Sequence, residues 1–307
     1  QEHWKKFPPK PAQDEMSINC SGSHCLQSKN CKQCFEVSGA EDGKYLWMVH
    51  GNTKDCYDVS SWGNNMSLCY DSCNIGENAS ELKFCQETGI NVMNAEYCKL
   101  CDGANLFGSV SVRKGEYVIL NKKYSAQEYS ALREKIINHM NEMPYKDKRG
   151  NSYCYGEFFP MELSPFAYNE SVASHFFPLS NEDIIQNGLR YKETEIRQHS
   201  ATVKVGDLPD HIRDIKDSIL NEVIECQTCG RGFKVIPVEL KFLRERNFPL
   251  PRECPFCRIQ EKFNQWVKNL RLLPRICDKC GAHFETEFAK EEAPIIYCKK
   301  CWQEEYT

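Results

Sequence analysis

Eight cysteines in the C-terminal part of the chain occur as four pairs with the spacing C-x-x-C. The pairs are Cys226 and Cys229, Cys254 and Cys257, Cys277 and Cys280, and Cys298 and Cys301. A C-x-x-C turn directs two thiolates at one point, about 2.3 Å from a Zn²⁺ ion, and a second such turn completes a closed tetrahedron. Closed sites of this kind are usually structural, so the pattern predicts two structural Zn²⁺ ions.

The spacing leaves open how the four pairs combine. Pairing in sequence order places 24 residues inside the first site and 17 inside the second, and an interleaved pairing is also possible. Gly230 and Gly281 directly follow the first pair of each set, where a sharp turn needs a positive φ. We expect a helix after the second pair of each set, which in the first module runs from about residue 258 to 270.

The residues around the first two pairs carry a further pattern. They read Glu225-Cys-Gln-Thr-Cys-Gly-Arg-Gly-Phe233, then Glu239, Phe242, Pro249 and Pro251, then Cys254-Pro-Phe-Cys-Arg258. This stretch resembles the small "probable zinc-ribbon" family of bacterial proteins. With the second module, residues 275–281 and 296–302, the whole chain is similar to uncharacterised cysteine-rich zinc-ribbon proteins of metagenomic bacterial genomes. What the resemblance implies is bound zinc, since neither group has an established activity.

Length and cysteine content limit the class of protein. A chain of 307 residues with 41% hydrophobic residues can form two or three domains with real cores. Nineteen cysteines cannot all pair within one chain, and eight have metal-type spacing, so a reducing cytoplasm fits best. No run of eighteen apolar residues occurs, so no membrane span is expected. Because the chain begins with Gln1, a processed end or a fragment remains open.

The distribution of charge indicates one basic segment. The net charge is −4, but residues 231–275 contain eleven Lys/Arg and four Asp/Glu. Clustered Lys and Arg bind phosphate backbones through counterion release. The sequence therefore predicts a nucleic-acid contact surface formed by Arg244, Arg246, Arg252, Arg258, Lys262, Lys268 and Arg271.

Short cysteine-aromatic segments recur through residues 19–107 at intervals of about twelve to fifteen residues, separated by Gly, Asn and Ser turns. Such a repeat predicts a small β-solenoid with two short strands per coil, in which cysteine acts as a small buried side chain. A further metal site among Cys20, Cys25, Cys31 and Cys34, or disulfides, are the alternatives. Residues 1–18 are polar and proline-broken, and we expect them to form a tail.

The remaining segments complete a mainly β chain with small α+β zinc modules. Residues 108–143 predict a hairpin that turns at Lys114-Gly115, followed by a helix that begins with a capping box at Ser125, and together they cap the solenoid. Residues 144–217 predict an irregular aromatic and proline-rich connection. Tandem modules of zinc-ribbon or treble-clef type then occupy residues 218–270 and 271–307.

No catalytic motif is predicted. His283 and Glu285 precede the last C-x-x-C pair, in the ligand order of zinc-dependent deaminases, but Tyr297 stands where that signature has proline. The sequence therefore favours a non-enzymatic zinc-binding protein whose modules bind the backbone of RNA or DNA. A protein-interaction or assembly scaffold built on the solenoid is the alternative, and an enzyme of unknown class that uses the middle segment is the second alternative.

Overall fold

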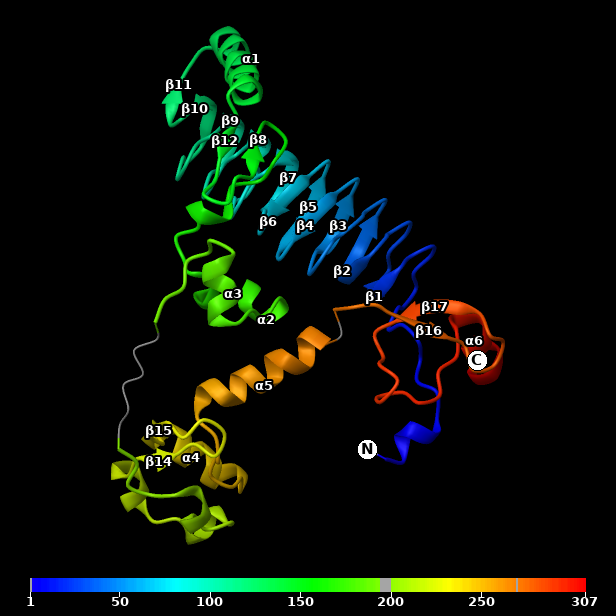
Figure 1. The fold of residues 1–307 in the computed structure, drawn as a ribbon, viewed down its shortest axis with the longest axis vertical. Helices are drawn as coiled ribbons and strands as arrows, with labels where there is room; N and C mark the ends of the chain where they lie inside the picture. Colours follow the sequence, from blue (N-terminus) through cyan, green and yellow to red (C-terminus); the bar gives the residue numbers. More distant parts are fainter. Residues whose placement is uncertain (1, 194–199, 269) are drawn as a thin grey trace. The chain divides into compact units, whose positions relative to one another are not determined.

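The computed structural model describes residues 2–193, 200–268 and 270–307 (Figure 1). The chain forms two compact units. The solenoid unit comprises residues 1–168, 179–190 and 268–307, and the first-module unit comprises residues 169–178 and 191–267. The structure is mainly β, with a β-solenoid of about eight turns and two clusters of four cysteines, which confirms the predicted fold class.

Parallel strands stacked one behind another form the solenoid (Figure 1). The main sheet runs in the order β1 (Gly22–Leu26), β2 (Cys34–Glu41), β3 (His50–Lys54), β5 (Gly63–Ser67), β7 (Gly76–Lys83), β8 (Met93–Glu96), β9 (Gly103–Phe107), β10 (Gly115–Ile119) and β11 (Lys122–Lys123). Off this path, β4 (Tyr57–Ser60) pairs in parallel with β6 (Tyr70–Cys73). In the parallel pairs, partner residues lie 11 to 13 positions apart in sequence, as Met93 with Ala104 and Thr53 with Met66.

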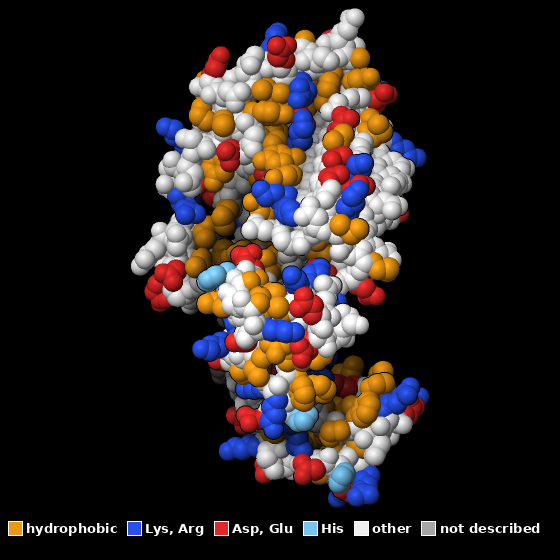
Figure 2. All heavy atoms as spheres, turned by 90° about the vertical axis from the view of Figure 1, so that its right-hand side faces the viewer, with side chains coloured by type: hydrophobic (Ala, Val, Ile, Leu, Met, Phe, Trp, Pro, Cys, Tyr) orange, Lys and Arg blue, Asp and Glu red, His pale blue; other side chains and the backbone are white. Residues whose placement is uncertain are grey.

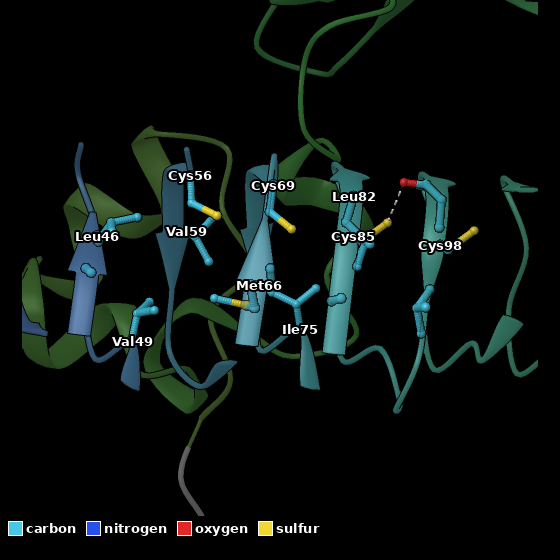
Figure 3. Packing of buried hydrophobic residues seen from close by; sticks show 14 of the residues in the cluster. Leu46, Val49, Cys56, Val59, Met66, Cys69, Ile75, Leu82, Cys85 and Cys98 are labelled. Atoms are coloured by element: carbon cyan, nitrogen blue, oxygen red, sulfur yellow. Dashed lines mark hydrogen bonds between the residues drawn. The ribbon is translucent and has the colours of Figure 1, made fainter. Parts of the chain in front are cut away.

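Along much of each turn of the solenoid, every third side chain is buried in the interior, where side chains of successive turns pack together (Figure 3). One run of such positions is Cys31, Cys34, Val37 and Ala40. The residue just before an inward one has a positive φ, such as 54° at Asn30 and 51° at Gln33. The predicted two strands per coil occur where β3 and β4, and then β5 and β6, lie in one turn. The three-residue repeat was not predicted, because many residue types occupy the bent position and leave no compositional signal.

The buried cysteines satisfy backbone groups at these bends. The thiols of Cys56, Cys69 and Cys85 each donate to the carbonyl oxygen two residues earlier, at 3.3 Å. Hydroxyls do the same at equivalent positions, where Ser72 donates to the carbonyl of Tyr70 at 2.9 Å and Thr53 to that of Gly51 at 2.8 Å. Cysteine is therefore used here as a small apolar side chain with one donor. In the described part of the chain all cysteines are free thiols, without disulfides.

The C-terminal end of the solenoid is capped as predicted, although the hairpin differs. Its turn lies at Leu120 and Asn121, between β10 and β11, and not at Lys114-Gly115. Gly115 instead continues the parallel ladder beside Gly103, where a Cβ on Gly103 would lie 2.0 Å from the carbonyl oxygen of Gly115. Helix α1 (Ala126–Glu142) follows, and both hydrogen bonds of its predicted capping box are present at Ser125.

The segment after α1 packs on the last turns of the solenoid through a buried carboxylate. Glu96, 1% exposed, accepts from Arg133 of α1 at 2.7 and 2.8 Å and from the hydroxyl of Tyr155 at 2.8 Å. Phe159 packs edge-on against Tyr97, with the ring centroids 5.8 Å apart. This irregular segment contains β12 (Tyr145–Lys146), β13 (Ser152–Tyr153) and, further on, α3 (Asn181–Gln186).

Each cysteine module has a short antiparallel hairpin and a helix. The first-module unit contains α2 (Ala173–Phe176), β14 (Ile224–Glu225), β15 (Gly232–Phe233), α4 (Pro237–Arg246) and α5 (Pro255–Lys268), and the second module contains β16 (Leu273–Ile276), β17 (His283–Thr286) and α6 (Lys299–Tyr306). Helix α5 begins three residues before the predicted start at 258. Among the described residues, no helix combines the length and the apolar character needed to span a membrane.

The ladder of the solenoid begins inside the segment that the sequence suggested as a tail. Glu15 pairs in parallel with Leu26, and Ile18 pairs in parallel with Lys29. The amide of Glu15 donates to the carbonyl of Cys25 at 3.0 Å, which adds a rung beyond β1. A short 3₁₀ helix (Trp4–Lys6) precedes this rung.

Candidate metal centres

The four sulfur atoms of the first cluster lie close enough together to bind one metal ion. The Sγ atoms of Cys226, Cys229, Cys254 and Cys257 are all within 4.8 Å of one another, and those of Cys229 and Cys254 are 3.8 Å apart. In a regular tetrahedron with metal–sulfur distances of about 2.3 Å, sulfur atoms are about 3.8 Å apart. The cluster therefore fits a four-coordinate metal ion, and its members pair in sequence order.

A hairpin and a helix start position this first cluster. Strands β14 and β15 bring the ends of the first C-x-x-C turn together, and Gly230, with φ 70°, donates to the carbonyl of Cys226 at 2.9 Å. The second pair lies at the start of α5, where the amide of Cys254 donates to Cys226 Sγ at 3.2 Å. Burial opposes ionisation of Cys226, but backbone N–H donors outweigh it and lower its pKa to about 6.

The second cluster repeats this arrangement. Cys277, Cys280, Cys298 and Cys301 have their Sγ atoms within 4.8 Å of one another, and Cys280 and Cys298 are 3.8 Å apart. The amide of Cys298 donates to Cys277 Sγ at 3.2 Å, as in the first cluster. Against the effect of burial, backbone donors lower the pKa of Cys277 to about 6.

Each cluster needs a cation to become fully ionised. Burial, followed by hydrogen bonding to neighbouring thiols, raises the pKa of Cys301 to about 12 and raises that of Cys257 as well. Four thiolates that close together repel one another, and a bound divalent metal removes this penalty by replacing the protons. Both clusters can therefore hold a metal ion, so the chain has two candidate sites.

Three of the predicted nucleic-acid contacts bond instead to their own module. Arg244 donates to the carbonyl of Ile215 at 2.9 Å and pairs with Asp217 at 2.6 Å. Arg258 pairs with Glu239 at 3.3 Å. Arg252 donates to four acceptors at 2.8 to 3.1 Å, namely the carbonyls of Val205, Leu208 and Pro209 and the carboxylate of Asp210. Arg244 and Arg252 thus fasten the preceding loop onto the module, and Arg258 joins α5 to α4.

The other four predicted contacts are divided between the two units, so the predicted surface stays a prediction. The guanidinium of Arg246 lies 6.0 Å from the ring centroid of Phe242, and Lys262 is exposed on α5. Arg271 belongs to the solenoid unit, and the side chain of Lys268 lies outside the described residues. The first-module unit contains thirteen Lys/Arg and thirteen Asp/Glu, so acidic segments offset its basic one. On the face drawn in Figure 2, basic and acidic side chains are interspersed.

The position of the second module could not be predicted from the sequence. Its hairpin and helix lie against the first turn of the solenoid: the hydroxyl of Ser23 donates to Glu287 at 2.6 Å, and both side chains are buried. Thr286 donates to the carbonyl of Pro11 at 2.5 Å, and the indole of Trp302 to that of Pro8 at 3.3 Å. The second cysteine module therefore closes the N-terminal end of the solenoid (Figure 1).

No protein-family model matches this chain, and no curated protein matches it either. The suggested resemblance to zinc-ribbon proteins thus stays a prediction.

Proposed function

We propose that this protein is a non-enzymatic, zinc-stabilised scaffold that binds other polypeptides along its β-solenoid. In this proposal Zn²⁺ fills both cysteine clusters, whose hairpin-and-helix build is that of zinc-ribbon or treble-clef modules. Support for zinc comes from four thiolate donors at tetrahedral spacing with no oxygen ligand in either cluster. Metal analysis of the purified chain should find two zinc atoms per molecule.

The observation that carries the scaffold proposal is an exposed row of aromatic rings on the solenoid. Tyr45, Tyr57 and Tyr70 lie on successive turns and are each 41% exposed. Further along, Phe84 and Tyr97 extend the row, but the chain's own segment around Tyr155 covers them, and Phe84 is only 2% exposed. The solenoid thus already binds one segment of its own chain on this side, which turns at Tyr155 and Gly156, and the aromatic row continues beyond that segment.

Nucleic-acid binding is the competing proposal, and less supports it. Its clearest remaining groups are Arg246 and Lys262, since Arg244, Arg252 and Arg258 have acceptors within their own module. If nucleic acid were the partner, affinity would fall steeply between 50 and 200 mM salt, because binding would release counterions.

One experiment separates the two proposals. The zinc-loaded full chain is immobilised, panned against a display library of random fifteen-residue peptides, and titrated with labelled single- and double-stranded RNA and DNA at both salt concentrations. The scaffold proposal expects selected peptides with a shared pattern and nucleic-acid binding no stronger than micromolar. Tight, salt-sensitive nucleic-acid binding without peptide selection would overturn it, and a Lys262→Glu variant would then show whether α5 makes the contact.

A further inference from the structure

The aromatic row, defined as Tyr45, Tyr57, Tyr70, Phe84 and Tyr97, is continuous along the solenoid axis. The rings of Tyr45 and Tyr57 meet edge to face with centroids 5.9 Å apart, and Tyr57 and Tyr70 are direct partners in the β4–β6 pair. Tyr70 meets Phe84 at 5.7 Å, and Phe84 stacks on Tyr97 at 4.7 Å. One surface of uniform chemistry therefore spans five turns of the solenoid.

Half of this row has an occupant, which shows how a peptide can bind to it. The ring of Tyr155 lies 6.0 Å from that of Phe84, and the ring of Phe159 lies 5.8 Å from that of Tyr97. Between them, the amide of Gly156 donates to the hydroxyl of Tyr97 at 3.0 Å. The bound segment thus combines two aromatic anchors with one backbone hydrogen bond.

The other half of the row ends in a hollow. This hollow has a volume of about 450 Å³ and includes Phe35, Tyr45 and Trp47 on the solenoid and Leu270 and Leu272 of the segment that leads into β16. From Tyr45 to Tyr70 the row covers two strand spacings, about 10 Å, which an extended chain crosses in about three residues. The open half, Tyr45, Tyr57 and Tyr70, is therefore long enough for a short peptide with one large side chain at the hollow.

Acidic groups border this open half. Asp58 and Asp71 occupy equivalent positions on successive turns, just after Tyr57 and Tyr70. Burial raises the pKa of Asp71, and the nearby charges of Asp58 and Glu157 raise it further. In the described part of the chain, neither aspartate forms an ion pair. The amino group of Lys44 lies over the rings of Tyr45 and Tyr57, at 4.5 and 5.3 Å from their centroids. Aromatic faces next to unpaired carboxylates attract a cationic side chain.

We propose that the open half of the aromatic row, with Asp58 and Asp71, binds an extended polypeptide segment that carries arginine or lysine beside an aromatic residue. The aromatic residue of the segment continues the ring packing that Tyr155 and Phe159 make on the covered half. Its cation lies beside Tyr70 and Asp71, because Lys44 already covers the ring faces of Tyr45 and Tyr57 next to Asp58. This inference rests on the proposed scaffold function and names the surface and the class of partner.

The test uses the zinc-loaded full chain and a fluorescent synthetic peptide. The peptide copies residues 152–160 with Cys154→Ser and Glu157→Arg, and a matched peptide keeps the glutamate. We expect the arginine peptide to bind about tenfold more tightly than the glutamate peptide, because only the former places a cation beside Asp71. Tyr57→Ala should weaken binding at least tenfold, as for an interface hot spot, and the isosteric Asp71→Asn should weaken it about threefold to tenfold.

The control variant is Trp62→Ala, because Trp62 is also exposed on the solenoid but lies outside the row. Its binding should match that of the unmodified chain. If Tyr57→Ala does not fold, the test depends on Asp71→Asn. Its zinc content and thermal unfolding should match those of the unmodified chain, so a change in peptide binding would not reflect misfolding. Equal affinity for both peptides, or no effect of either variant, would overturn the inference.

Failure of this inference can be told apart from failure of the scaffold proposal. If library peptides bind the chain but are insensitive to Tyr57→Ala, the scaffold proposal stands and the assigned surface is wrong. If no peptide binds at all, both are wrong. A concentration-dependent dimer of the unmodified chain that Tyr57→Ala abolishes would show that a second copy covers the row, which also overturns the inference.

Discussion

Loss of the second metal ion should open the N-terminal end of the solenoid, whereas loss of the first should leave that end closed. The perturbation is a pair of matched double variants, Cys298→Ser with Cys301→Ser in the second cluster, and Cys254→Ser with Cys257→Ser in the first. Each removes two of four thiolate ligands, so neither cluster can close around its ion. The second module then loses the metal that holds its hairpin to its helix, and with it the contacts to the first turn.

The magnitude follows from the hydrogen bonds that join the module to the solenoid. Three of them would be lost, from Ser23 to Glu287, from Thr286 to Pro11 and from Trp302 to Pro8. At a net contribution of about 1 kcal/mol each, the first rung loses about 3 kcal/mol of local stability. An opening free energy lower by that amount means roughly 150-fold faster hydrogen exchange for amides protected only by local opening.

Hydrogen exchange followed by mass spectrometry measures this directly. Peptides covering residues 11–30 contain the amides of Glu15, Ile18 and Gln27, which bond across the first rung. These should exchange faster in the second-cluster variant and at the wild-type rate in the first-cluster variant. Amides near Gln86, several turns away, serve as the internal control. Equal exchange of the first rung in all three proteins would refute the capping role of the second module.

The freed rung also exposes an unpaired strand edge, and this gives a second readout. An exposed edge offers free N–H and C=O groups to other chains, which promotes edge-to-edge association. Light scattering at micromolar concentration should therefore rise for the second-cluster variant only, and restoring the ligands should abolish the difference.

Four further substitutions test individual parts of the structure. Glu96→Gln should lower the free energy of unfolding by about 3 kcal/mol in urea titrations, because it leaves the half-buried Arg133 without its charged partner. Burial opposes ionisation of Glu96, but the hydrogen bonds and charge of Arg133 outweigh it and lower its pKa. The wild-type protein should therefore lose this stability only as the pH falls through the acidic range. Cys69→Ser should cost about 1 kcal/mol less than Cys69→Ala, since the hydroxyl keeps the bond to the carbonyl of Ser67. Arg252→Ala should destabilise the first-module unit by about 2 kcal/mol in thermal unfolding and leave nucleic-acid titrations unchanged. Tyr45→Asn should leave the free energy of unfolding unchanged or raise it, while it weakens peptide binding.

Local patterns made the metal clusters predictable. Two thiols three residues apart in sequence need only one turn to face a common point. The C-x-x-C spacing alone therefore predicts most of the geometry of each metal site. The capping box at Ser125 is equally local, and both of its hydrogen bonds are present. The solenoid could be predicted because its turns repeat in sequence, although the three-residue repeat within each turn could not.

Features that depend on contacts between distant parts of the chain could not be predicted from the sequence. The eleven Lys/Arg of residues 231–275 suggested a basic surface, but Arg244 and Arg252 pair with Asp217 and Asp210, which precede them by 27 and 42 residues. Contact between Ser23 and Glu287 joins positions 264 residues apart. Pairings of this kind follow from packing, for which spacing along the chain carries no information.

The bent backbone positions of the solenoid bear on the role of Tyr45 in the open aromatic row. The bent positions of the solenoid have φ near 50°, which asparagine, aspartate and glycine adopt at little cost and bulky side chains do not. Phe84 and Tyr97 occupy such positions at φ 55° and 53°, and packing under Tyr155 offsets their strain. Tyr45 has φ 56° and yet is 41% exposed, so burial does not offset the same cost there. Leu68 and Leu100 lie outside the row with φ 55° and 56° and are also exposed, so this cost does not by itself mark a binding site. What distinguishes Tyr45 is that its ring packs against Tyr57 and borders the hollow, where the proposed ligand would cover it.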